Sequence, residues 1–329
     1  MSSEAYTAPM IRTFFTRGTS SPGPPYTLTR APLRRRARFA WLARVAHSRV
    51  PYTFSVALII LIGGVIQAQT QPPVTYEAYA VRFGILPGFA VSGLVAGADR
   101  GRKIDIPVMV WLLKGSNGRQ VLIDAGFYRQ RFLDQWDPQQ FRTPAAAVEA
   151  AGVKPEAITD IIISHAHWDH VDGADLFPKA TVWIQREEYR YYTGEAWFAR
   201  NTHGGVFAED MDALLKINTD GRLRFVEGDD QEVVPGIRCY IGGKHTRESQ
   251  YCAVKIEGGT AVFTSDNVYL YENFEKHVPI AQTLDAASNL KAQDRAKSFA
   301  SDPRLIVPGH DPAVFERFER VADGIVRIK

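Results

Sequence analysis

Apolar and polar positions from residue 108 onwards form a pattern that predicts strands interspersed with helices. Two apolar runs within Val108–Gly126 flank a turn at Gly115–Gly118, where Asn117 and Gly118 favour positive φ, so they predict a β-hairpin. Further apolar runs predict strands at 159–164, 180–185, 236–243, 250–267 (two strands that turn at Gly258 and Gly259) and 304–310. Helices are predicted at Thr143–Val153, Glu187–Tyr192 and Asn289–Ala300. This mixture predicts an α/β protein with layered sheets and outer helices.

The first 68 residues differ in charge from the rest of the chain. They hold nine of the 39 basic residues, all arginine, and one of the 36 acidic residues, Glu4. The whole chain has a formal charge of +3, so the part after residue 68 carries −5. A mildly acidic folded part argues against a nucleic-acid partner.

Residues 50–68 contain no charge and include the dense apolar run Phe54–Ile66. Arg44 and Arg49 precede this run, and the small residue Ala68 follows it. A membrane span needs about 20 apolar residues, so a run of this length is more typical of the core of a secretory signal. We expect a cleaved signal peptide and a periplasmic or secreted protein. An uncleaved anchor, which would give the chain its membrane contact, and a buried core helix are the alternatives.

Residues 1–49 are rich in Arg, Pro, Ser and Thr and show no clear periodicity. We interpret them as a disordered extension or as a start codon placed too early, with the true chain beginning near residue 45. A basic patch at Leu33–Arg44 for nucleic acid or lipid headgroups is the alternative. Peptides recovered from residues 1–40 of the native protein would contradict the early-start interpretation.

The chain has two cysteines, Cys239 and Cys252, both in predicted strands. A core of this size needs no covalent link, so we expect two buried free thiols. A disulfide between them is the alternative for an exported protein.

The stretch SHAHWDHVDG, Ser164–Gly173, follows a predicted buried strand and concentrates metal-binding side chains. His165 and His167, two residues apart on a loop that leaves the strand, can point at one ion. Asp169 and His170 come directly after them and can face a second ion. Neutral imidazole and carboxylate are natural ligands of zinc and similar divalent ions.

Four residues cannot saturate two metals, so further ligands are expected downstream. His245 lies in a glycine-flanked loop between two predicted strands, Asp266 lies at the end of a strand, and His310 comes just past another. Delivery of ligands by loops from strand ends is how a rigid scaffold positions a site.

The pattern H-x-H-x-D-H followed by a separate His, Asp and His resembles the motif of the metallo-β-lactamase superfamily at every position. The resemblance covers most of residues 76–320 and implies an αββα sandwich, a single catalytic domain at 70–329, with the site at one edge of two sheets. It implies that His165, His167 and His245 hold one metal, that Asp169, His170 and His310 hold the other, and that Asp266 bridges both. Asp124, in VLIDAG, matches an Asp-containing turn that supports the family's site.

Within the superfamily the chain is most similar to the N-acyl homoserine lactonases. The similarity lies in the hairpin, in Val182–Tyr189 and in Ser265–Pro279, where Tyr269 falls three residues after Asp266. In those lactonases this Tyr hydrogen-bonds the substrate carbonyl. Their Gly-His-[Thr/Ser]-Pro-Gly-His loop is Lys244–Ser249 here, so charged residues replace both glycines and the exact substrate stays open. Trp168 lies between ligands and either lines the substrate pocket or covers the metals.

The resemblance implies a hydrolase with two divalent ions, zinc first and Fe, Mn or Co as alternatives. We expect a hydroxide held between the ions to attack the lactone carbonyl, Tyr269 to stabilise the oxyanion and Asp169 to pass a proton to the leaving oxygen. The expected reaction opens the ring of N-acyl homoserine lactones and so quenches quorum signalling. Alternative substrates are another ester, lactone or thioester, as in glyoxalase II, and less favourably a β-lactam. The alternative to an enzyme is a metal-binding protein without activity. Monomer and homodimer both stay open.

Overall fold

The computed structural model describes residues 72–199 and 203–329. The predictions for residues 1–49, as an extension, and for 50–68, as a signal peptide or anchor, lie outside these described residues. Within the described ranges, no helix is both long enough and apolar enough to cross a membrane.

The N-terminal half of the sheet is built around two long antiparallel strands, β1 and β2. The hairpin predicted from the sequence is present as β2 and β3, and β4 to β6 continue the sheet in parallel. The strands lie in the order β12 (Glu319–Ala322), β13 (Ile325–Ile328), β1 (Tyr76–Ala90), β2 (Lys103–Gly115), β3 (Gln120–Ile123), β4 (Asp160–Ile162), β5 (Thr181–Gln185) and β6 (Leu223–Val226).

The C-terminal half of the sheet continues from β1 through a single parallel pairing of Tyr76 with Ile256. Its strands lie in the order β7 (Gln231–Val234), β8 (Ile237–Ile241), β9 (Gln250–Ile256), β10 (Gly259–Ser265) and β11 (Ile306–Pro308). The β9–β10 turn falls at the predicted pair of glycines, where Gly258 has a φ of +85°.

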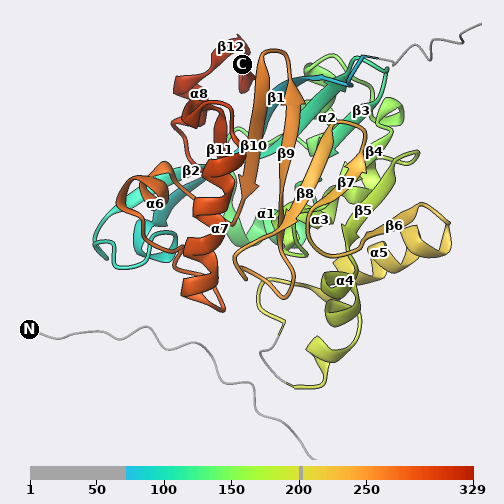
Figure 1. Ribbon diagram of the computed structural model, residues 1–329. Helices are drawn as coiled ribbons and strands as arrows, with labels where there is room; N and C mark the ends of the chain where they lie inside the picture. The colour runs from blue at the N-terminus through green and yellow to red at the C-terminus, as the bar shows by residue number, and fades with distance from the viewer. Residues whose placement is uncertain (1–71, 200–202) are drawn as a thin grey trace, which may run out of the picture. The chain divides into compact units, whose positions relative to one another are not determined.

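Helices cover the outer faces of both halves (Figure 1). Those of the N-terminal half are α1 (Gln130–Trp136), α2 (Pro144–Ala150), α3 (Trp168–Val171), α4 (Arg186–Tyr192) and α5 (Ala208–Thr219). The others are α6 (Tyr271–Lys276), α7 (Ala286–Phe299) and α8 (Val314–Arg317). Helix α2 begins where the sequence predicts, because the Thr143 side chain accepts a hydrogen bond from the Ala146 N–H at 3.2 Å and Pro144 occupies the first turn.

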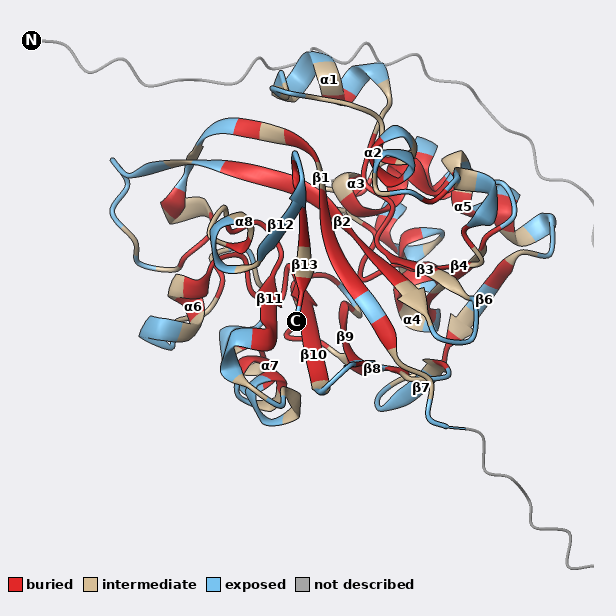
Figure 2. Ribbon diagram, turned by 90° about the horizontal axis from the view of Figure 1, so that it is seen from above, coloured by how far each residue is buried: buried red, intermediate tan, exposed pale blue. Residues whose placement is uncertain are grey.

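Three apolar cores separate the layers, since alternate side chains of a strand face opposite sides of a sheet. In β1, Val81 enters the core beneath α2 to α5, whereas Ala80 enters the core between the two sheet halves. In β9, Val254 faces this middle core, whereas Ala253 packs with α7. Figure 2 shows the strands largely buried and the helices exposing their outer faces. This layering confirms the predicted αββα arrangement.

One edge of the sheet collects the strand ends that carry the predicted ligands. Strand β3 pairs in parallel with β4, and β10 with β11, so the chain leaves each pair at the same edge. Asp124 follows β3, Asp266 follows β10 and His310 comes shortly after β11. The Ser265 hydroxyl donates to the Asp124 carboxylate at 3.1 Å, so the strand ends of both halves meet there.

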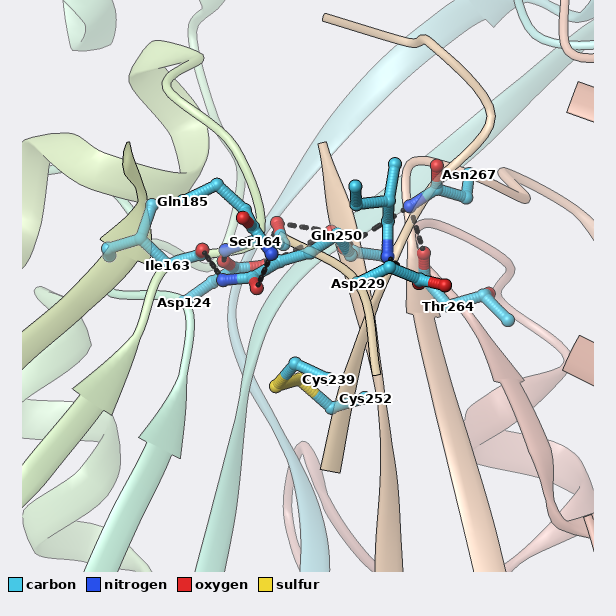
Figure 3. The surroundings of a disulfide bond; sticks show 12 residues. Asp124, Ile163, Ser164, Gln185, Asp229, Cys239, Gln250, Cys252, Thr264 and Asn267 are labelled. Atoms are coloured by element: carbon cyan, nitrogen blue, oxygen red, sulfur yellow. Dashed lines mark hydrogen bonds between the residues drawn. A yellow bond between two sulfur atoms is a disulfide. The ribbon is translucent and has the colours of Figure 1, made fainter. Parts of the chain in front are cut away.

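The expectation of two free thiols is wrong, because Cys239 and Cys252 form a disulfide. The antiparallel pairing of β8 with β9 places the two residues directly opposite each other, and both are buried. Residues opposite each other in an antiparallel ladder lie close enough for a disulfide. Figure 3 shows the disulfide between the two strands, near a row of hydrogen-bonded side chains that includes Asp124, Ser164 and Gln250.

Candidate metal centre

The structure brings all seven predicted metal ligands together in two groups. Ligand atoms within each group lie within 4.8 Å of one another. The first group is His165, His167, His245 and Asp266, and the second group is Asp169, His170 and His310. His203 and His277, the other histidines beyond residue 200, belong to neither group.

The carboxylate of Asp266 faces both groups. Its Oδ2 lies 3.6 Å from Nε2 of His165 and 3.3 Å from Nε2 of His245. Its Oδ1 lies 3.3 Å from Nε2 of His170 and 3.0 Å from Nε2 of His310. One carboxylate oxygen therefore serves each group, which is the geometry that a bridging ligand requires.

The three histidines of the first group are carried by two loops from different halves of the sheet, and Asp266 follows β10. His165 and His167 lie on the loop between β4 and α3, and His245 lies on the loop between β8 and β9. His245 donates from Nδ1 to the carbonyl oxygen of Gln282 at 2.7 Å, so its Nε2 is directed at the site. That Nε2 lies 2.9 Å from Nδ1 of His167, so the two imidazoles point at a common position.

The second group is carried by α3 and by the chain just after β11. Nε2 of His170 lies 3.4 Å from Oδ2 of Asp169, and Nε2 of His310 lies 3.6 Å from the same oxygen. His310 donates from Nδ1 to the carbonyl oxygen of Pro107 in β2 at 3.1 Å. Its remaining nitrogen is thereby fixed towards the site.

Asp124 supports the second group from the end of β3. Its backbone has a φ of +61°, and its side chain is fully buried. The carboxylate accepts a hydrogen bond from Nδ1 of His170 at 2.8 Å, from the Ser164 N–H at 2.7 Å and from the Ser164 hydroxyl at 2.9 Å. Asp124 thus orients one ligand and joins the loops that follow β3 and β4, as predicted. Ser164 and Ser265 complete this network, and no sequence signal singled them out.

The donor set fits divalent metal ions. Among the described residues, Nε2 of His165, Nε2 of His170 and Oδ1 of Asp266 are buried and have no hydrogen-bond partner. Buried polar atoms without partners are costly, so three of them at the two groups fit the coordination of positive ions. Imidazole nitrogens and carboxylate oxygens are suitable ligands for such ions.

The electrostatics of the two groups differ. In the first group, burial lowers the pKa of His165 well below its ordinary value and that of His167 to about 3, which keeps both imidazoles neutral. In the second group, burial lowers the pKa of His170 and His310, but the carboxylates of Asp266 and Asp169 outweigh it and raise both pKa values above their ordinary value, so a metal would displace a proton there. Burial alone would raise the pKa of Asp266, but the imidazoles of His170 and His310 hold it well below its ordinary value. Neutral imidazole and ionised carboxylate are the forms that bind metals.

A cavity of about 400 Å³ opens beside the two groups. Its apolar wall includes Leu86, Phe89 and Trp136. Trp168 lines the same cavity. Its ring stacks on Phe132, with centroids 4.6 Å apart, and on Trp136, with centroids 5.5 Å apart.

Tyr269 also lines this cavity and lies between the two groups. Its ring centroid is 5.6 Å from that of His245 and 5.9 Å from that of His310. Burial raises the pKa of Tyr269 well above its ordinary value, so the side chain remains a phenol that can donate a hydrogen bond.

The loop that departs from the lactonase pattern, Lys244–Ser249, is held by an ion pair between two of its own residues. Nζ of Lys244 lies 2.6 Å from the Glu248 carboxylate, so the two charges that replace glycines pair with each other. The Arg247 guanidinium lies over the Tyr191 ring, 5.1 Å from its centroid. The His245 side chain remains directed at the site.

A family model for the metallo-beta-lactamase superfamily matches residues 104–310. The match covers more than half of the chain and includes all seven metal-binding candidates. The chain belongs to the metallo-beta-lactamase superfamily.

Several relatives and solved structures are N-acyl homoserine lactonases. The chain is 29% identical over 228 residues to an N-acyl homoserine lactonase of a Bacillus species, which covers 64% of this chain and 84% of the relative. It is 28% identical over 251 residues to the N-acyl homoserine lactonase AttM of Azorhizobium caulinodans, with 70% and 91% covered. The fold matches AiiA of B. thuringiensis with N-decanoyl-L-homoserine bound at the active site, at a TM-score of 0.60, 23% identity, and 76% and 98% covered.

Proposed function

We propose that the chain is a metal-dependent hydrolase that opens the lactone ring of N-acyl homoserine lactones. The observation that carries this proposal is the Asp266 carboxylate shared between two groups of ligands beside an apolar cavity. The relatives named as lactonases support the choice of substrate. Zinc is the proposed metal in both groups, because three of the four first-group donors and two of the three second-group donors are imidazoles.

Divalent ions, when bound, supply Lewis-acid polarisation of the carbonyl and lower the pKa of water. The residues of the chain supply the remaining chemistry. The Tyr269 phenol donates a hydrogen bond to the substrate carbonyl oxygen as negative charge develops on it. The Asp169 carboxylate lies at the edge of the cavity, and its side chain is 13% exposed, so it can take a proton from water and give it to the leaving ring oxygen.

The apolar wall of the cavity explains how an acyl chain would be held. Leu86, Phe89 and Trp136 offer apolar surface next to the ligand groups. A cavity of about 400 Å³ falls within the range of small-molecule sites. An acyl group buried against these side chains would place the lactone at the ligand groups.

The test is acid release, followed with a pH indicator, from a short-chain and a long-chain N-acyl homoserine lactone by the zinc- or cobalt-loaded chain. We expect rapid hydrolysis of at least one lactone, abolished by a chelator. A protein that holds two metals and hydrolyses neither lactone would contradict the proposed substrate. The same assay with an aryl ester and a glutathione thioester would then identify the class of ester that it cleaves.

We also propose that the protein is exported. The disulfide between Cys239 and Cys252 supports this proposal, because disulfides form and persist mainly in oxidising compartments. The uncharged segment 50–68 has the composition of a signal peptide. Fractionation of the source cells, with the N-terminus of the mature chain determined by mass spectrometry, tests the proposal. A reduced, uncleaved chain in the cytosolic fraction would contradict it.

A further inference from the structure

A buried carboxylate on α4 lies outside both ligand groups. Glu188 is in the first turn of that helix, and none of its surface is exposed. Among the residues that the structure describes, no Lys, Arg or His forms an ion pair with it. A buried carboxylate without a cation is costly, so its hydrogen bonds must offset that cost.

The two oxygens of Glu188 bind the two loops that carry the first group of ligands. Oε1 accepts a hydrogen bond from the N–H of Ala166, the residue between His165 and His167, at 2.9 Å. Oε2 accepts one from the N–H of Glu248, three residues after His245, at 2.6 Å. Burial raises the pKa of Glu188, and the Thr246 side chain together with these two N–H donors opposes that shift because they stabilise the ionised form.

These two contacts differ from the other link between the loops. The N–H of Gln250 donates to the Ser164 carbonyl at 2.8 Å, and the Gln250 side chain donates to the Ile163 carbonyl at 2.7 Å. Both bonds join the chain just before His165 to the start of β9, which comes after His245. Glu188 instead joins the segments beside the ligands themselves, so it can set their spacing while the strands stay in place.

Charge points to the same role. Four carboxylates lie in or beside the two ligand groups, namely those of Asp124, Asp169, Asp266 and Glu188. If all four were ionised, two divalent ions would carry an equal and opposite formal charge. The carboxylate of Asp124 lies beside the second group, and that of Glu188 lies beside the loops of the first.

We propose that Glu188 is a positioning residue that ties the His165–His167 loop to the His245 loop and so sets the metal affinity of the first group. Glu188 does not ligate the metal in this proposal. The proposal rests on the metal site of the proposed function but not on the identity of the substrate.

The test is metal affinity of the full chain, measured by competition between zinc and a chromophoric chelator, for the wild type and for Glu188→Gln. A Gln side chain has one acceptor oxygen, so it can serve only one of the two N–H donors and carries no charge. We expect one of the two sites to bind zinc about 10- to 100-fold more weakly, and the other to be unchanged. Cobalt absorption titrations should show the same loss of one site.

Glu187→Gln is the matched control. Glu187 precedes Glu188 on the same helix, is partly exposed and pairs with Arg190 at 3.6 Å. This variant should bind both metals as the wild type does. Glu188→Asp keeps the charge and should recover part of the lost affinity, also in the event that Glu188→Gln folds poorly.

Unchanged zinc affinity of both sites in a folded Glu188→Gln protein would overturn the proposal. Equal weakening of both sites, together with a lowered melting temperature, would also overturn it, because it indicates a general structural role. The readout is independent of lactone hydrolysis. A chain that cleaves no lactone but loses one metal site in Glu188→Gln would refute the proposed substrate and support the role of Glu188.

Discussion

The two groups of ligands share Asp266 but are supported in different ways. In the second group, each imidazole is fixed from behind by a strand or its end, since His170 donates to Asp124 after β3 and His310 donates to Pro107 in β2. In the first group, Nδ1 of His165 lies 2.9 Å from the Ser164 hydroxyl just after β4, but His245 donates to the Gln282 carbonyl, which lies on the segment between α6 and α7.

This difference shows which ligand group depends on the sheet and which depends on contacts between loops. The second group inherits the rigidity of paired strands, whereas the first group requires contacts between loops, including those of Glu188. Changes in the loops should therefore act on the first group, and changes at the strand ends should act on the second. The Asp266 carboxylate faces both groups, so a change of Asp266 should affect the two groups alike.

The largest effect is expected from Asp266→Ala. Without the carboxylate, both groups lose the oxygen that faces them, so we expect loss of both ions and of hydrolysis. Metal content by atomic emission, with hydrolysis measured in parallel, checks this. Asp212→Ala, an exposed change on α5, is the control. Two ions retained per chain would show that the groups are independent of a shared carboxylate.

Tyr269→Phe should separate chemistry from metal binding. The ring lies beside His245 and His310 but offers no ligand atom to either group. Loss of a donor to the developing oxyanion should lower kcat by about 10²-fold, with both ions retained. Tyr271→Phe is the matched control, because Tyr271 is buried in the middle core beside Arg317. Equal kcat values for the two variants would exclude Tyr269 as the donor.

Asp124→Asn should weaken the second group more than the first, because Asp124 contacts His170 directly and reaches Nδ1 of His165 only through the Ser164 hydroxyl. The Asn side chain has nearly the same shape as Asp, but it weakens the hydrogen bond that orients His170. Loss of such a partner costs about 10- to 100-fold in metal affinity. Titration with zinc and a competing chelator should show one site weakened more than the other, and the double variant with Glu188→Gln should weaken both. Asp134→Asn, an exposed change on α1, is the control. If the first group bound zinc more weakly and the second did not, Asp124 would not be the support of the second group.

The clustering of the candidate ligands was predictable from the sequence because their chemistry and their place in the pattern coincide. His165, His167, Asp169 and His170 follow a short apolar run, and that run is β4. Asp266 and His310 each come at the end of a predicted strand, and parallel pairing brings such ends to one edge. Local pattern and global fold agree at these positions.

Features that depend on register or on distant packing were not predictable. Glu188 stands beside Glu187 in a short helix, and nothing local distinguishes the buried carboxylate from the partly exposed one. The disulfide depends on the β8–β9 register, which places Cys239 opposite Cys252. Strand β1 was not predicted. Most of its residues are buried, because both faces of the strand are covered, so the alternation of apolar and polar residues that marks a half-exposed strand is weak.

A smaller effect, on the free energy of unfolding, is expected near Asp172, two residues after His170. The Arg129 guanidinium contacts Asp172 and lies 3.6 Å from Oδ1 of Asp210 on α5. Burial and the neighbouring Asp172 carboxylate raise the pKa of Asp210 to about 8. The folded protein therefore holds a proton on Asp210 that the unfolded chain, with an ordinary pKa of 3.8, releases near pH 4.

The sign of the pH dependence follows from that raised pKa. The contribution of Asp210 to the free energy of unfolding is fully present below pH 4 and is lost as pH rises to about 8. Asp210→Asn mimics the protonated side chain and removes this loss. We expect its free energy of unfolding to exceed that of the wild type at pH 9 by on the order of 1 kcal/mol or more, and by less at pH 5. Denaturant titrations of both proteins at the two pH values check this, with Asp212→Asn as the exposed control. A stability difference that does not change between the two pH values would mean that Asp210 is ionised in the folded protein at both, and would contradict the raised pKa.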